Sequence, residues 1–110
     1  MPTFRFQSLD IYRLARDLAV MVQQARIKDA ELRDQATRAA KSCFLNLAEG
    51  LPSDLAGIRR RHFAFVNGSL GELCAAIDLS LALGSIDAKT ARAIDAGCQR
   101  FAMMLRKLRR

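Results

Sequence analysis

Apolar residues recur at intervals of three and four along almost the whole chain, the spacing that places side chains on one face of an α-helix. The first such run, from about residue 8 to 26, contains Ile11, Leu14, Ala15, Leu18 and Val22. Two more runs extend over residues 29–50 and 53–83, and a fourth extends from residue 87 to the end of the sequence. The pattern therefore predicts four helices.

Short segments rich in helix-capping residues separate these runs. Gly50, with Leu51 and Pro52 after it, and Gly84 are expected to end the second and third helices. The residues expected at the N-termini of the last three helices are Asp29 or Glu31, Ser53 or Asp54, and Asp87. Because such short connections join long helices, we expect an all-α fold, an antiparallel up-down-up-down four-helix bundle.

The length and composition fit one soluble domain over residues 1–110. Apolar residues make up 51% of the 110 residues, and the sequence contains only 2 prolines. Uninterrupted apolar runs are a few residues long, far from the roughly 18 to 20 of a membrane span. The three cysteines, Cys43, Cys74 and Cys98, lack CxxC spacing, which favours buried reduced thiols in a cytoplasmic protein without a membrane partner.

Charge is where the sequence departs from an ordinary helical domain. The net charge is +7 with a pI near 10.2. The expected topology brings ten of the Lys and Arg residues to one end with four Asp and Glu, a net +6, and leaves +1 at the other end. Such an end is expected to attract the phosphates of RNA or DNA. The residues expected to bind nucleic acid are Arg13, Arg16, Arg59, Arg60, Arg61, Arg106, Lys107, Arg109 and Arg110.

The alternative is that these cations are merely solvated. Lys and Arg at a helix C-terminus favour the helix dipole, whereas Arg59, Arg60 and Arg61 stand near a helix start, where positive charge is unfavourable. A role beyond helix stability is therefore expected first for these three.

The third predicted helix carries two glycines one turn apart, Gly68 and Gly71, each costing roughly 1 kcal/mol relative to alanine. It also has two apolar stripes. The stripe expected in the core contains Phe63, Val66, Leu70, Leu73, Ile77 and Leu81, and the second contains Phe65, Ala76, Leu79 and Leu83. Small residues let another helix approach closely, so we expect either tight packing inside one bundle or self-association. The residues expected at an oligomer interface are Phe65, Gly68, Ser69, Glu72, Leu79 and Leu83.

Four blocks of sequence resemble one known family. They are Leu9-Asp10-Ile11-Tyr12 with Ala15, the segment QATRAAKS at 35–42, Asn46-Leu47-Ala48-Glu49-Gly50, and the segment GSLGEL at 68–73. In order and spacing they resemble the 23S rRNA intervening sequence proteins over nearly the whole chain. The resemblance implies a cyclic homo-pentamer of four-helix bundles without enzyme activity.

A related branch, the accessory variability proteins of diversity-generating retroelements, is similar in fold and binds a reverse transcriptase and nucleic acid. The residues do not separate the two branches. Two departures from the usual family pattern are a cysteine at position 43, where isoleucine is common, and the very basic run at 59–61.

Catalytic and metal-binding alternatives are weaker. His62 and Cys74 would be about 18 Å apart along one helix, too far to share a zinc ion, so neither a metal nor another cofactor is expected. A Cys43–His62 nucleophile pair lacks a third orienting group. We therefore expect a non-enzymatic nucleic-acid-binding module. The alternatives are a protein adaptor, for example for a reverse transcriptase, and a basic C-terminal helix lying on a membrane.

Overall fold

The computed structural model describes residues 5–109, and all regular structure in that range is helical. A short 3-10 helix, η1, covers Arg5–Ser8. The four α-helices are α1 (Asp10–Gln24), α2 (Ala30–Gly50), α3 (Ala56–Ala82) and α4 (Ala88–Leu108). The prediction of an all-α protein with four helices is confirmed, and the first helix is shorter than expected at both ends.

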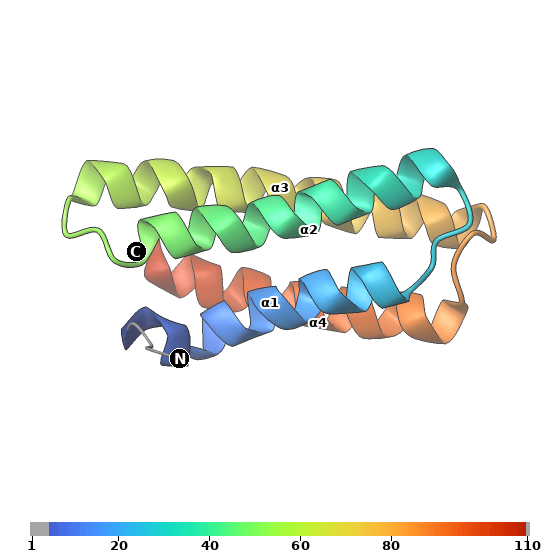
Figure 1. The fold of residues 1–110 in the computed structure, drawn as a ribbon, viewed down its shortest axis with the longest axis horizontal. Helices are drawn as coiled ribbons and strands as arrows, with labels where there is room; N and C mark the ends of the chain where they lie inside the picture. Colours follow the sequence, from blue (N-terminus) through green and yellow to red (C-terminus); the bar gives the residue numbers. More distant parts are fainter. Residues whose placement is uncertain (1–4, 110) are drawn as a thin grey trace.

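The four helices lie side by side in a bundle about 43 Å long. Each helix packs on the next along the chain, and α4 also packs on α1. Figure 1 shows the start of α1, the end of α2, the start of α3 and the end of α4 together at the left. We call this end the basic pole. At the opposite end, the Lys28 backbone N–H donates to the Ser85 carbonyl at 2.8 Å. This bond joins the α1–α2 connection to the α3–α4 connection.

Two of the predicted helix caps are confirmed. The Asp29 carboxylate accepts from the Leu32 backbone N–H at 3.0 Å, and the Asp87 carboxylate accepts from the Thr90 backbone N–H at 3.0 Å. The latter bond, with that from the Thr90 hydroxyl, lowers the pKa of Asp87. The prediction for α3 is wrong, because Leu55 occupies the cap position and its side chain makes no capping bond, while the Ser53 hydroxyl accepts from the Leu55 backbone N–H at 3.2 Å.

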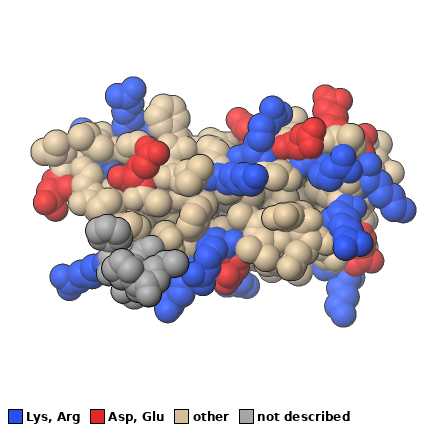
Figure 2. All heavy atoms as spheres, viewed as in Figure 1, with Lys and Arg blue, Asp and Glu red and all other residues tan. Residues whose placement is uncertain are grey.

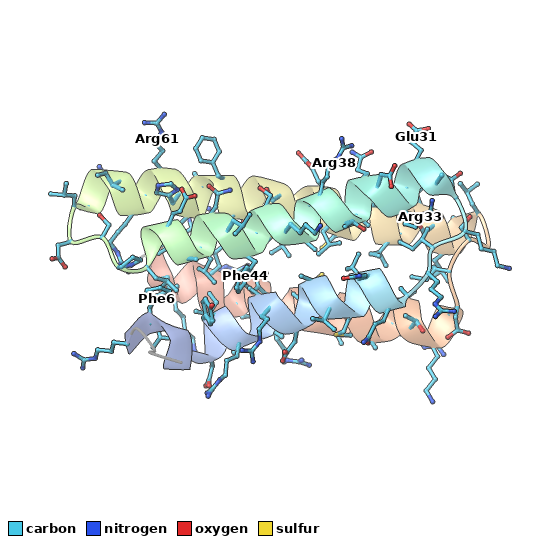
Figure 3. The ribbon with its side chains drawn as sticks, viewed as in Figure 1. Phe6, Glu31, Arg33, Arg38, Phe44 and Arg61 are labelled. Atoms are coloured by element: carbon cyan, nitrogen blue, oxygen red, sulfur yellow. The ribbon has the colours of Figure 1, made fainter. Side chains whose placement is uncertain are left out.

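The core draws on all four helices. Phe63, Phe101, Leu47 and Ile94 are at most 2% exposed. Tyr12 links η1 to the bundle, since its ring lies 5.7 Å from that of Phe6 and 5.0 Å from that of Phe44 (Figure 3).

Some predicted core positions are not buried. Leu81, expected in the core stripe, is 40% exposed, and Cys74 is only half-buried. Ala76, assigned to the second stripe, is buried. The core near the end of α3 instead contains Ser80, whose hydroxyl donates to the Ala76 carbonyl at 2.6 Å.

The glycines used for close packing are not the expected pair. A Cβ at Gly50 would lie 2.9 Å from the Phe63 ring, and one at Gly97 would lie 2.8 Å from Leu18. Gly68 and Gly71 are exposed, with open space where a Cβ would project. Tight packing within one bundle, one of the two explanations for these glycines, is therefore wrong.

Among the described residues, α3 is also the one helix long and apolar enough to cross a membrane by length and composition alone. The expectation that no segment reaches this threshold considered only uninterrupted runs. Core helices of soluble proteins pass the same test, and α3 does bury Phe63, Val66 and Leu73 in the bundle. Other apolar side chains of α3, such as Phe65 and Leu79, lie on the surface.

Candidate nucleic-acid interface

Five of the nine predicted cations at the basic pole are available to a ligand. Their side chains are exposed, and within the described part of the chain none has a carboxylate within 4.0 Å. Arg61 extends away from the bundle in Figure 3. The five are Arg60, Arg61, Arg106, Lys107 and Arg109. Arg110 lies outside the described residues.

Arg59 has a structural role. Its guanidinium donates to the Leu51 carbonyl at 2.6 Å and to the carbonyls of Ser53 and Gly50 at 3.3 and 3.4 Å. It also lies 5.1 Å above the centre of the Phe63 ring. Arg59 therefore binds carbonyls at the C-terminus of α2 and in the connection that follows it, where positive charge complements the helix dipole. The prediction that residues 59–61 have a role beyond helix stability is wrong for Arg59. It considered only α3, which contains Arg59, and not α2, whose C-terminus Arg59 contacts.

Arg13 and Arg16 lie beside acidic neighbours on α1. Arg13 contacts the Asp10 carboxylate at 2.6 Å, and the Arg16 Nε lies 3.8 Å from the Asp17 carboxylate. These exposed pairs add little stability. They do reduce the charge that either arginine presents to a phosphate.

Two adjoining depressions follow the seam between α3 and α4 at the basic pole. The first has a volume of about 370 Å³ and is lined by Ala56, Arg59, Arg60, Phe63, Leu108 and Arg109. The second, of about 410 Å³, shares Arg109 and is lined by Asn67, Ala102, Leu105 and Arg106 as well. Together we call them the α3–α4 groove. Sequence reasoning placed these arginines at one end, but it gave no signal of a groove between the two helices.

The far end of the α3–α4 seam has a different charge pattern from the groove. The depression there is lined by Asp78 and Asp95 together with Arg92. The lining of the α3–α4 groove contains arginines and no carboxylate. In the face shown in Figure 2, acidic and basic side chains occur at both ends of the bundle.

A chain of polar contacts joins α2 to α3 beside the basic pole. The Ser69 hydroxyl donates to Ser42 at 2.8 Å, and the Asn46 amide donates to the Ser42 carbonyl at 3.0 Å. His62 Nδ1 lies 3.3 Å from the Asn46 side-chain oxygen and 3.5 Å from the Glu49 carboxylate. Asn46 therefore satisfies a backbone carbonyl of its own helix, and Glu49 lies beside a histidine of α3.

The cysteines have other partners than His62. The Cys43 thiol is 3.7 Å from the Val66 carbonyl, and burial, together with the neighbouring Cys74, raises its pKa to about 12. The same causes raise the pKa of Cys98. None of the three cysteines forms a disulfide. Within residues 5–109, no group of three or more His, Cys, Asp or Glu side chains is placed to hold a metal ion.

Most of the predicted oligomer-interface residues form an exposed stripe along α3. Phe65 is 53% exposed and Leu83 is 60% exposed, while Gly68, Glu72 and Leu79 are also on the surface. Ser69 is half-buried because its hydroxyl bonds to α2.

Comparison with known proteins adds one positive finding. No curated protein matches the chain. The model of the family described as 23S rRNA-intervening sequence protein matches residues 7–107. This match covers α1, α2, α3 with its exposed stripe, and α4 except its last residue, while Leu108 and Arg109 of the α3–α4 groove lie beyond it. The chain therefore belongs to the 23S rRNA-intervening sequence protein family.

Proposed function

We propose that this protein is a non-enzymatic, cytoplasmic nucleic-acid-binding module that contacts the phosphate backbone of RNA or DNA with its basic pole. The observation that carries the proposal is the group of five exposed cations there without a carboxylate partner among the described residues. Uncompensated cations at one end focus the field and release counterions from a polyanion. The same surface has no exposed aromatic ring among its lining residues, so contacts to phosphate dominate over base selection.

Binding is expected to depend steeply on salt. Five phosphate contacts per chain to a single strand correspond to a slope of about −3.5 in a plot of log affinity against log salt. Raising NaCl from about 50 to about 200 mM should then weaken binding about 100-fold. Fluorescence anisotropy with labelled RNA and DNA measures this slope. Absence of binding at the lower salt concentration, or an affinity that salt leaves unchanged, would contradict the proposal.

We further propose that antiparallel up-down-up-down bundles of this kind assemble into a cyclic homo-pentamer, with the exposed stripe of α3 against a neighbouring copy. Large apolar side chains and two uncovered glycines on one helix support this arrangement. A partner helix could approach the α3 backbone closely at Gly68 and Gly71, which would offset their cost within the helix.

Alanine at both glycines is expected to have opposite effects on the chain and on its assembly. G68A/G71A should stabilise the single chain by about 1 kcal/mol per site, because each position is helical and open. It should weaken self-association at least about 10-fold, as two new methyl groups hold the partner away. Sedimentation velocity over a concentration series measures association, and thermal unfolding of dilute protein measures stability. G57A, on the same helix but about 12 Å before the start of the stripe at Phe65, is the control and should leave association unchanged. Equal association of G68A/G71A and wild type would exclude a close approach.

The same stripe supports a second candidate function, an adaptor that docks a protein such as a reverse transcriptase. In that case the apolar side chains of α3 contact the partner and the basic pole is secondary. Substituting Phe65 and Leu79 by serine would then abolish capture of a reverse transcriptase encoded beside this protein, with nucleic-acid binding retained. Loss of self-association alone would instead favour the homo-oligomer.

A further inference from the structure

We infer that the α3–α4 groove is the nucleic-acid site, and that it takes a single strand, RNA or DNA, in preference to a duplex. This inference rests on the proposed function and narrows it from a charged pole to one groove. Three features of the groove support it, namely its positive charge, its apolar floor and its length.

The charge of the groove is of one sign. Arg59 and Arg60 of α3 line the same depression as Arg109 of α4, and Arg106 and Arg109 line the adjoining one. No Asp or Glu is among the lining residues of either depression. Because Arg59 is committed to the end of α2, the arginines free to contact a phosphate here are Arg60, Arg106 and Arg109.

The floor of the groove is apolar. Ala56 is exposed and Ala102 and Leu108 are half-buried, so these three residues present the apolar surface, while Phe63 and Leu105 are buried beneath it. A duplex presents phosphates and sugars to a protein surface and keeps its bases stacked inside. An unpaired strand offers base faces to an apolar floor and to guanidinium planes, while its phosphates meet the arginines at the rim.

The length and position of the groove set the size of the site. From Ala56 to Asn67, α3 rises about 16 Å. At about 3.4 Å per nucleotide along a strand, this length accommodates about four to five nucleotides. Further along the same seam, Asp78 and Asp95 line the next depression and would repel a phosphate. The strand is therefore confined to the basic end.

Two double variants with equal charge changes test the site. R60E/R109E reverses two free arginines of the groove. R13E/R16E reverses two exposed cations of the same pole that do not line the groove and that already lie beside Asp10 and Asp17. Anisotropy titrations use a labelled uridine dodecamer, a thymidine dodecamer and a DNA duplex of the same length. Far-ultraviolet circular dichroism establishes that each variant is folded, and R60Q/R109Q replaces the first variant if charge reversal unfolds it.

The groove variant is expected to bind both single strands at least about 10-fold more weakly than wild type, and its salt slope should fall by about 1.4, which is 0.7 for each lost contact. The control variant should lose less than about 3-fold and keep the slope of the wild type. Wild type should prefer the single strands over the duplex by at least about 10-fold.

Three other outcomes would contradict the groove, the single-strand preference or the proposed function. Equal losses in the two variants would show diffuse binding over the pole, which rejects the groove and retains the proposed function. Equal or tighter binding of the duplex would reject the single-strand preference. Failure of wild-type protein to bind any of the three probes would reject the proposed function itself.

Discussion

Replacing Phe101 by alanine is expected to lower the free energy of unfolding by about 3–5 kcal/mol. Phe101 is 0% exposed on α4, where it packs in the core shared by all four helices. Truncation removes the transfer free energy of the ring and leaves a cavity that four rigid helices close only in part. Because domains of this size are stable by about 5–15 kcal/mol, this one change removes a large share of the total.

Denaturant titration at a fixed protein concentration measures this loss, since self-association would otherwise change the apparent stability. Met103→Ala is the matched control. It lies on the same helix two residues away and is 60% exposed, so its change should stay within about 0.5 kcal/mol. A loss below about 1 kcal/mol for F101A would mean that the core around α4 is not packed as described.

The regular spacing of apolar residues was sufficient to predict the four helices and most of the core. It failed near the end of α3, where Leu81 is exposed and Ser80 is buried. Hydrophobicity alone favours leucine for a core position. A serine can take that position because the preceding turn of the same helix satisfies its hydroxyl, through the bond to Ala76.

The glycines show a second limit of sequence reasoning. Gly50 ends α2 as expected, but the sequence did not indicate that its lack of a side chain also makes room for Phe63 and His62 of α3. Such contacts depend on how two helices cross, which local spacing does not encode. For Gly68 and Gly71 the sequence allowed two explanations, and only the open space around them in the folded chain excludes one.

The candidate site was predictable as an end of the bundle and not as a groove. Charge could be assigned to that end because the connections are short and each reverses the chain. Whether an arginine is free or committed depends on contacts over several ångströms between separate elements. Arg59 and Arg60 are neighbours in sequence, yet one binds three carbonyls and the other is exposed.

The difference between these two arginines leads to a second large effect on stability. Arg59→Met should lower the free energy of unfolding by about 2–3 kcal/mol, because it removes charged donors from the carbonyls of Gly50, Leu51 and Ser53. Methionine keeps an unbranched apolar stem over the Phe63 ring, so the loss reports mainly on the guanidinium. The affected carbonyls lie at the end of α2 and in the connection to α3, where few other donors can replace the half-buried guanidinium without moving that connection.

Arg60→Met is the control for this experiment, since it removes the same charge from the next residue. Arg60 is exposed and has no carboxylate within 4.0 Å among the described residues, so its stability should change by less than about 0.5 kcal/mol. Nucleic-acid affinity should respond in the reverse order, because Arg60 is free to contact a phosphate and Arg59 is not. Denaturant titration and anisotropy on the same two proteins therefore separate the two roles. Equal stability losses would contradict the capping role of Arg59. A larger loss of affinity for folded R59M than for R60M would show that Arg59 is a ligand-binding residue.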